Sequence, residues 1–287
     1  MSSATALDHV GVAGPDLATL AAAWERLGFT LTPRARHAGR RTPDGPVEAF
    51  GTGNRCIMLR EGYVELIAVV DPTAFNTLED TLARYAGLHI IALEIEDEAA
   101  SLQRLRLAGL DIPGVAYLER PVDDADPTGL KARFARLPLP RAPEGTLQLI
   151  RHLTPEAIWQ EGFLHHANRA VALESVVMAV ASPAATSMRL SVLAGLPVVP
   201  DPLGGYALPL PRGMVRMLPP EALGSVFPGA EVPALPFIAG LVLRTGDGNL
   251  AARRLLAERG VPHADLPAGL LVGAEATGGA SLLFAPG

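Results

Sequence analysis

Two polar residues stand in stretches of the sequence that otherwise have the composition of buried strands. His9 lies in the apolar run 7–12, and Glu65 lies in the apolar run 63–69. Burying an imidazole or a carboxylate alone is costly, so we expect the two strands to lie side by side with both groups on one face. A divalent metal, or a hydrogen bond between His9 and Glu65, would then satisfy both groups. These two residues are the first candidates for chemistry.

The strands that carry His9 and Glu65 belong to a unit that recurs along the chain. In the first unit a strand at 7–13 precedes a helix opened by Asp16, and strands are expected at 29–31, 54–59 and 63–70. Further units begin near residues 88, 173 and 237, and each opens with a strand, a helix and a glycine. The glycines that end the four helices are Gly28, Gly109, Gly195 and Gly260.

One such unit has too few strands to bury its own sheet, so the units must pair. The predicted fold class is α+β, with four βαβββ modules forming two paired-module domains whose curved, mixed sheets each form a cleft. The predicted domains are residues 1–160, which carry the candidate site, and residues 161–287, a degenerate second pair. The pattern leaves open whether the first module pairs with the second or with the fourth.

Composition restricts the class of function. The chain has 287 residues, is 49% hydrophobic and has a net charge of -6, which argues against a general binder of nucleic acid or anionic membranes. The sequence has no apolar run long enough to span a membrane, and its N-terminus lacks the features of a signal peptide. Both observations predict a cytoplasmic protein. Cys56 is the single cysteine, so an intramolecular disulfide is excluded and a small core residue is expected.

The module pattern and its motifs resemble the vicinal oxygen chelate superfamily, which includes glyoxalases, bleomycin-resistance proteins and extradiol dioxygenases. The first half is most similar to its glyoxalase-like domain proteins. The motifs that carry the resemblance are Asp8-His9-Val10, His37-Ala38-Gly39-Arg40, Gly51-Thr52-Gly53-Asn54-Arg55 and Gly62-Tyr63-Val64-Glu65-Leu66-Ile67. It covers residues 5–155 well and rests on module pattern alone over 170–285.

The resemblance implies a divalent metal, Zn, Ni, Mn or Fe, held by residues of the first and last strands of paired modules. His9 and Glu65 match the ligand positions of the first module, and Gln148 matches the last-strand position of the second. His89 is the candidate on the second module's first strand. Counting back from the helix start aligns Ile90 with His9 instead, and a slip of one residue turns a side chain to the opposite face.

Other polar residues are candidates for contacts with a substrate. His37, Arg40, Asn54 and Arg55 could line the cleft as anion or carbonyl contacts, and the alternative for this stretch is turn chemistry around its glycines. The arginines of 34–41 form either a solvated loop or a contact to an anionic substrate. His165 and His166 are expected to face solvent.

The second half departs from the superfamily pattern. Ser175 stands where a ligand histidine is expected, and Arg216 falls near the position of the ligand carboxylate. Extradiol dioxygenases of this length keep their ligands in the second half, so the resemblance argues against that chemistry.

The leading hypothesis is a metal-dependent enzyme with isomerase or lyase chemistry. The metal would polarise a small carbonyl or hydroxy-ketone substrate, and Glu65 would act as the base. The alternative is a metal-free small-molecule binding protein of the bleomycin-resistance type, in which Arg36, Arg40 and Arg55 matter more than His9. A third option is a scaffold whose modules only pack and dimerise. The expected partners are a small molecule and, in a homodimer, a second copy of the chain.

Overall fold

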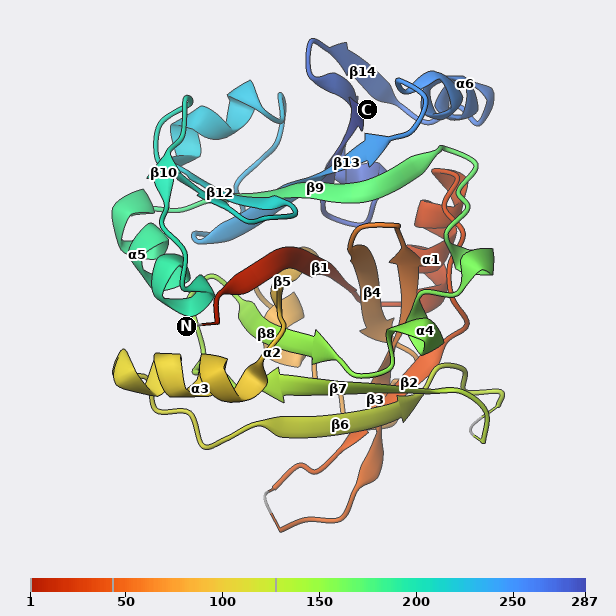
Figure 1. Cartoon of the computed structure of the whole chain (residues 1–287). Helices are drawn as coiled ribbons and strands as arrows, with labels where there is room; N and C mark the ends of the chain where they lie inside the picture. Colours follow the sequence, from red (N-terminus) through yellow and green to blue (C-terminus); the bar gives the residue numbers. More distant parts are fainter. Residues whose placement is uncertain (1, 43, 127) are drawn as a thin grey trace.

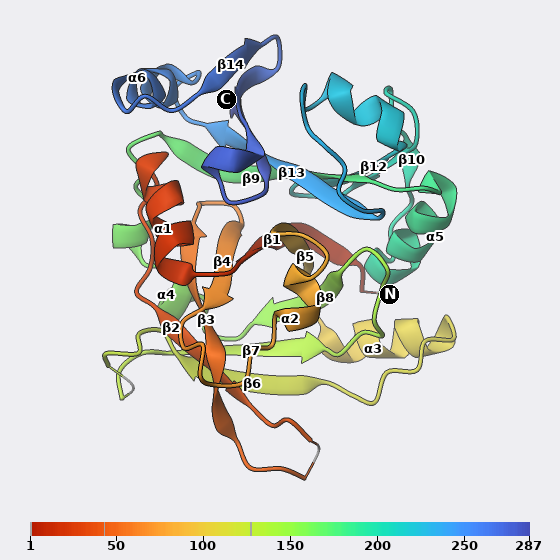
Figure 2. The same cartoon turned by 180° about the vertical axis from the view of Figure 1, so that it is seen from behind.

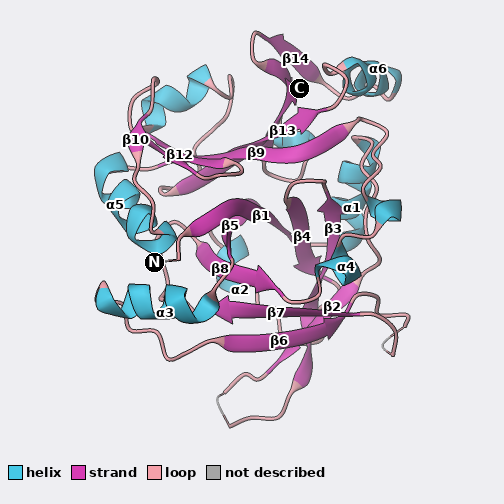
Figure 3. Ribbon diagram, in the orientation of Figure 1, coloured by secondary structure: helices cyan, strands magenta, loops and turns pink. Residues whose placement is uncertain are grey.

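The computed structural model describes residues 2–42, 44–126 and 128–287, and it is built from four successive groups of strands with helices at their margins (Figures 1 and 3). The first group contains β1 (Ala4–Gly14), α1 (Leu17–Arg26), β2 (Ala35–Gly39), β3 (Glu48–Met58) and β4 (Tyr63–Val69). After α2 (Glu79–Leu82), the second contains β5 (Gly87–Ile95), α3 (Glu98–Leu107), β6 (Ala116–Pro121), β7 (Lys131–Leu137) and β8 (Thr146–His152).

The short helices α4 (Pro155–Ile158) and η1 (Glu161–Phe163) lead into the second half. The third group contains β9 (Ala170–Ala179), α5 (Pro183–Ala194), β10 (Val199–Pro200), β11 (Tyr206–Pro209) and β12 (Met214–Leu218). After η2 (Pro220–Ser225), the fourth contains β13 (Phe237–Thr245), α6 (Leu250–Glu258), β14 (His263–Leu266), β15 (Gly269–Val272), η3 (Ala274–Ala276) and β16 (Ser281–Pro286). This order confirms the predicted fold class.

Strand pairing shows which groups belong together. In each group the first strand runs parallel to the last, as in β1 with β4 and β5 with β8. The first and second groups join through antiparallel β1 and β5, and the third and fourth join through antiparallel β9 and β13. Neighbouring groups therefore pair, which resolves the alternative that the sequence left open. The division into independent domains at residue 160 stays a prediction.

The sheet of the first pair curls so that its distant strands meet. Ala132 of β7 packs in one apolar cluster with Cys56 of β3 and Tyr63 of β4, although β5, β8 and β1 lie between them in the sheet. The face that carries these three residues is called the inner face below. His9 lies on it because His9 is the direct cross-strand partner of Tyr63.

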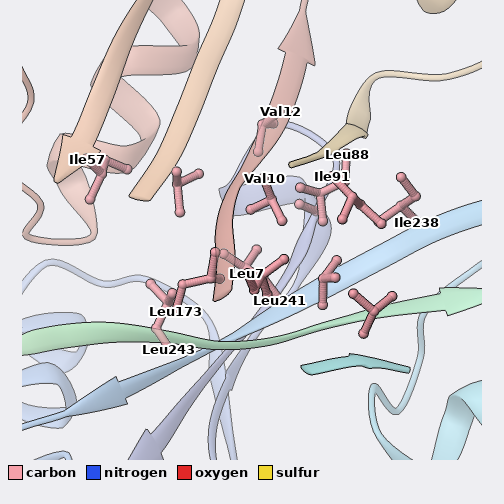
Figure 4. Close-up of a cluster of buried hydrophobic side chains, with 14 of the residues drawn as sticks. Leu7, Val10, Val12, Ile57, Leu88, Ile91, Leu173, Ile238, Leu241 and Leu243 are labelled. Atoms are coloured by element: carbon pink, nitrogen blue, oxygen red, sulfur yellow. The ribbon is translucent and has the colours of Figure 1, made fainter. Parts of the chain in front are cut away.

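The opposite face of the first pair packs against the second half of the chain. Leu7 and Val10 of β1 share one core with Leu173 of β9 and Leu241 of β13, as Figure 4 shows. In Figures 1 and 2 the strands β9 and β13 lie above β1 and β5. The amide of Leu7 also donates to the carbonyl of Arg212 at 2.8 Å. The two halves therefore share a continuous hydrophobic core.

A bulge in β1 determines which side chains reach the inner face. Leu7 pairs with Leu93 and His9 pairs with Ala92, so β1 contains one extra residue, Asp8, that has no cross-strand partner on β5. Leu7 and Val10 consequently point into the same core although three positions separate them. A bulge of this kind leaves the extra residue outside the regular alternation. Asp8 and His9 thus both become available to the inner face.

Local sequence signals account for the first helix. Asp16 caps α1, because its carboxylate accepts a hydrogen bond from the amide of Thr19 at 2.7 Å. Gly28 follows the helix with a φ of 91°, which favours glycine.

The strand expected at 29–31 is absent, because this buried stretch has no strand partner and β2 forms instead at 35–39. No helix among the described residues is long and apolar enough to cross a membrane.

Candidate functional site

The imidazole of His9 is held by its neighbour in the sequence. Asp8 and His9 are both buried, and His9 Nδ1 lies 2.6 Å from Asp8 Oδ1. Because an ionised carboxylate can only accept, Nδ1 carries the proton of this hydrogen bond. The other ring nitrogen, Nε2, is then left with its lone pair, which is the arrangement that prepares a histidine to bind a metal.

A second histidine binds the same carboxylate. His152, at the end of β8, places Nε2 at 3.2 and 3.1 Å from the two oxygens of Asp8. Burial favours the neutral acid, but the two histidines outweigh it and hold the pKa of Asp8 well below its usual range. Asp8 is therefore an ionised group inside the protein, and it fixes both imidazoles.

Glu65 faces the free nitrogen of His9 across a gap. Its Oε2 lies 3.9 Å from His9 Nε2, which is too long for a hydrogen bond, so the predicted hydrogen bond between these two residues is not formed. Its other oxygen accepts a hydrogen bond from the side-chain amide of Asn54. Metal ions bind imidazole nitrogen and carboxylate oxygen at about 2.0–2.2 Å. The two facing atoms therefore fit an ion bound between them.

Tyr63 covers this pair from one side. Its ring stacks on His9 with centroids 4.4 Å apart and planes at 21°. Burial raises the pKa of Tyr63 well above its usual value, and the charges of Asp8 and Glu65 add to the effect. The phenol thus stays protonated. His9 is only 3% exposed, and Glu65 keeps 14% of its side chain accessible.

Gln148 lies on the same face of the sheet as His9, whereas the side chain of His89 bonds elsewhere, to Tyr85. His9, Ala92 and Gln148 are successive cross-strand partners on β1, β5 and β8, so Gln148 belongs to the inner face. His89 occupies the extra position of a bulge in β5, and its Nε2 lies 2.8 Å from the carbonyl of Tyr85. Ile90 fills the ligand position instead, with its side chain packed over Gly11.

The residues expected to contact substrate divide into two groups. Asn54 and His37 lie on the inner face, where His37 Nδ1 is 3.1 Å from the hydroxyl of Thr52 and burial lowers the pKa of His37. Arg55 points away from that face and pairs with Glu25 at 2.9 Å. Arg40 is exposed, and its guanidinium donates to the carbonyl of Gly45.

The neighbouring arginines are also engaged, since Arg34, Arg36 and Arg41 pair with Asp124, Asp71 and Glu48. The structure therefore favours the solvated-loop interpretation of this cluster over a contact to substrate.

A cavity of about 210 Å³ opens beside Cys56, the direct cross-strand partner of Glu65. Arg120 lines it together with the apolar side chains of Ile158 and Phe163. Cys56 is a buried core residue as expected, and burial, with a smaller effect from Glu65, raises the pKa of its thiol to about 12. The thiol is thus a wall of the cavity and not a nucleophile.

The family of the chain follows from its sequence. Residues 7–194, well over half of the chain, match the family described as a glyoxalase-like domain. The chain belongs to this glyoxalase-like family. The resemblance to the vicinal oxygen chelate superfamily is thereby confirmed. No curated protein matches the sequence.

Solved structures with the fold of this glyoxalase-like protein include one described as a hypothetical protein from Staphylococcus aureus, with a TM-score of 0.62, 14% identity and coverage of 98% of both chains. The Mn(II)-bound glyoxalase from Novosphingobium aromaticivorans has a TM-score of 0.58 and 13% identity, over 100% of this chain and 83% of that one. An extradiol ring-cleaving dioxygenase from B. fuscum has a TM-score of 0.54 and 12% identity, over 99% and 72%. At these identities the likeness shows the fold.

In this glyoxalase-like chain, His9 and Glu65 are the candidate ligands that face each other. Among residues 2–42, 44–126 and 128–287, no three or more His, Cys, Asp or Glu side chains are grouped to hold a metal ion. His9 and Glu65 are thus a pair, which Gln148 would supplement through its amide oxygen.

In the second half of the glyoxalase-like chain, Ser175 is buried. Arg216 is bound by Asp201, with its Nε and Nη2 at 2.7 and 2.8 Å from the two carboxylate oxygens. Neither residue is arranged as a metal ligand.

Two residues around His9 were not identified in the sequence analysis of this glyoxalase-like protein. Asp8 was visible as the neighbour of His9, but alternation along a strand assigns neighbours to opposite faces. His152 lies four residues beyond Gln148, and only the curl of the sheet brings it to Asp8. His166, expected to face solvent, is buried, and its Nε2 lies 2.8 Å from the carbonyl of Met58.

Proposed function

We propose that this protein is a glyoxalase-like metalloenzyme that acts on a small carbonyl or hydroxy-ketone substrate by isomerase or lyase chemistry. The observation that carries the proposal is the facing pair His9 Nε2 and Glu65 Oε2, 3.9 Å apart on the inner face. His9 and Glu65 would hold a divalent ion, Zn, Ni, Mn or Fe, and Gln148 is the candidate for a third ligand. The ion, when bound, polarises the substrate carbonyl.

The surrounding residues support this role. Asp8 fixes the ring of His9 with Nε2 turned toward Glu65, and Asn54 fixes one oxygen of Glu65. Such partners of metal ligands orient them and raise their affinity for the metal. The stacked ring of Tyr63 keeps water away from one side of His9. The orientations of His9 and Glu65 are therefore fixed in the absence of a ligand.

We assign proton transfer to Glu65. Its side chain is the accessible member of the pair, and its Oε2 makes no hydrogen bond to a described residue. Once released from the ion, the Glu65 carboxylate would accept a proton from the carbon next to the substrate carbonyl and return it to a neighbouring atom, which is the proton movement of an isomerase. The same step followed by loss of a leaving group gives a lyase.

The test is the metal content of the protein purified without chelator. We expect about one equivalent of a transition metal per chain, lost in the double variant His9→Ala, Glu65→Ala. His165→Ala is the matched control, because this imidazole is 61% exposed and should leave the metal content unchanged. Absence of metal, even after incubation with excess divalent ions, would contradict the proposal.

A second candidate function is supported by the small set of candidate ligands in the described part of the chain. If His9 and Glu65 bind no metal, the inner face and the adjoining cavity would bind a small molecule without catalysing a reaction. A chelator-insensitive binding signal, retained in the His9→Ala, Glu65→Ala variant, would favour this function over the enzyme. A cytoplasmic location and a homodimer stay predictions from the sequence.

A further inference from the structure

The inner face carries two arginines that no described carboxylate neutralises. Arg136 of β7 is half-buried, and its Nε is enclosed without any hydrogen-bond partner. The side chain of Arg120 in β6 makes one hydrogen bond to a described residue, a long one of 3.3 Å to the carbonyl of Pro121. Buried polar groups of folded proteins are nearly always paired, so the enclosed Nε of Arg136, without a partner among the described residues, indicates a missing ligand atom.

Strand register places both arginines on the inner face. Arg120 is the cross-strand partner of Ala132, which packs against Cys56 and Tyr63 on that face. Arg136 follows Ala132 by four positions along β7, and even spacing in a strand keeps side chains on one face. Burial lowers the pKa of Arg136 and the charge of Glu65 opposes that effect, as expected for a guanidinium within reach of the candidate site.

Cations on the outer face of the same strands are all paired. Lys131 and Arg133 of β7 bind Glu119, at 2.9 and 2.6 Å. Arg151 of β8 binds Glu98 at 2.8 Å. The lack of a partner is therefore a property of the inner face and not of this sheet in general.

The carboxylates near the two arginines are already occupied. Asp8 accepts from two histidines, and Glu65 accepts from Asn54. Two further carboxylates line the cavity, where Asp123 accepts from the amide of Ala125 at 2.8 Å and Asp126 from the hydroxyl of Thr128 at 3.2 Å. None of these four forms an ion pair with Arg120 or Arg136, so the positive charge remains available to a ligand.

The cavity beside Cys56 gives such a ligand a place. Arg120 lines it, and its apolar walls include Ile158 and Phe163. A site with apolar walls and a few convergent polar groups is the usual form of a small-molecule site. Guanidinium groups bind carboxylates and phosphates through two parallel hydrogen bonds, which neutral substrates cannot match.

We infer that the substrate carries an anionic oxygen group, a carboxylate or a phosphate, which Arg136 and Arg120 bind from the inner face beside the apolar wall of Ile158 and Phe163. The inference names the substrate class of the proposed site and rests on the proposed function only for the reaction at His9 and Glu65. The two arginines are assigned to binding and selectivity.

The experiment is a titration calorimetry series with three probes, glyoxylate, inorganic phosphate and neutral hydroxyacetone, on the full chain. We expect the wild type to bind glyoxylate or phosphate at least tenfold more tightly than hydroxyacetone. The double variant Arg120→Met, Arg136→Met should lose that preference, with a tenfold or larger rise in the Kd of the preferred anion. The comparison between glyoxylate and phosphate identifies the anionic group.

The matched control is Arg133→Met, Arg151→Met, which removes two paired arginines from the outer face of the same strands and should leave every Kd unchanged. The melting temperature gives a second measurement. The bound anion should raise Tm in the wild type and in the control but not in the inner-face variant. Since the inner-face arginines have no carboxylate partner, their loss should not lower the Tm of the free protein.

Running the series with chelator and again with added Mn²⁺ separates this inference from the proposed function. Arginine-dependent anion binding by a protein that takes up no metal would support the inference and contradict the enzyme. Metal uptake at His9 and Glu65 together with equal affinity for hydroxyacetone and the anions would overturn the inference. So would an inner-face variant that binds the anions like the wild type.

Discussion

Asp8 decides what the neighbouring histidine can do. Its carboxylate is shared by His9 and His152, so one buried negative charge sets the orientation of two rings. His152 keeps its Nδ1 enclosed without a partner, which shows that Asp8 alone holds that ring by hydrogen bonding. The chemistry of the pair His9 and Glu65 therefore depends on a residue that contacts neither substrate nor metal in the proposed mechanism.

Substitution of Asp8 tests this dependence. In Asp8→Asn the acceptor loses its charge, and the ring of His9 is no longer held with Nε2 toward Glu65. We expect metal affinity to fall by about 10–100-fold, the usual effect of removing a carboxylate that supports a histidine ligand. Competition with a chromophoric chelator measures the change. The exposed Asp111→Asn is the control, and unchanged affinity in Asp8→Asn would contradict the assigned role.

At the residue scale the sequence predicts the types of the reacting groups but not their partners. His9 and Glu65 are recognisable because each interrupts an apolar run. The roles of Asp8 and His152 depend on a bulge and on the curl of the sheet, and neither leaves a signal in single-residue spacing. His89 shows the same limit, since a second bulge carries it toward Tyr85.

The element that positions the site is the antiparallel pair β1 and β5. Gly11 of β1 lies under the side chain of Ile90, and a Cβ built on Gly11 would meet three atoms of Ile90 at 2.7, 2.8 and 2.9 Å. Glycine here is required by the close approach of the neighbouring side chain and not by a turn. The contact fixes how β1 presents His9, two residues earlier, to the inner face.

Substitution of Gly11 tests this contact. Gly11→Ala should lower the free energy of unfolding by about 1–3 kcal/mol, the usual cost of overpacking a tight core. Ile90→Ala in the same chain should restore part of the loss, because it removes the Cδ1 and Cγ1 atoms that lie 2.7 and 2.9 Å from the added methyl group. Urea unfolding of the four proteins of the double-mutant cycle measures the coupling, and strictly additive effects would rule out the contact as the cause.

At the element scale the sequence is a better guide. The capping residues Asp16, Asp97 and Ser182 and the glycines that follow the helices mark the helices in the chain to within a few residues. The prediction of a strand at 29–31 was wrong, because an apolar run alone does not show that a partner strand lies beside it. The buried side chain of Phe29 packs against Trp24 and Phe284 instead.

On the scale of the whole molecule, the two halves differ in what their inner faces hold. In the second pair the corresponding region is filled by apolar side chains, with Phe227 fully buried among Val177, Ala239 and Leu283. In the sequence, the sign of this difference was that Ser175 and Arg216 stand where a ligand histidine and a ligand carboxylate are expected. The pairing of neighbouring groups was beyond the sequence, because both arrangements bury the same strands. The second half thus supports the first through the shared core.

An ion pair in the second half should therefore affect the unfolding of the first. Arg216 holds the pKa of Asp201 below its usual value, so Asp201 contributes stability above its unfolded pKa of about 3.9, and this is lost as pH falls through the folded pKa. At pH 7, Asp201→Asn should lower the free energy of unfolding by about 1.5–3 kcal/mol. The difference from wild type should shrink toward pH 3.

Tryptophan fluorescence is the measurement for this prediction. Trp159 lies in the first half, and Asp201 lies in the second. Trp24 is replaced by phenylalanine, because its indole donates to the carbonyl of Thr277 in the second half at 2.8 Å and would report on both halves. In this Trp24→Phe background, a shift of the Trp159 unfolding midpoint caused by Asp201→Asn shows that the halves unfold together. An unshifted midpoint, with the loss seen only by circular dichroism, would show two independent domains, as the predicted boundary at residue 160 implies.

The rate at which a reagent labels the buried thiol of Cys56 measures how often the surrounding strands open locally. A single sulfur with a pKa of about 12 is almost wholly protonated near neutral pH, so a thiol reagent labels it only when β3 separates from its neighbours. The labelling rate therefore counts openings of the strand that carries Asn54 and borders Glu65. Any ligand that occupies the inner face should slow that rate, whether or not it reacts.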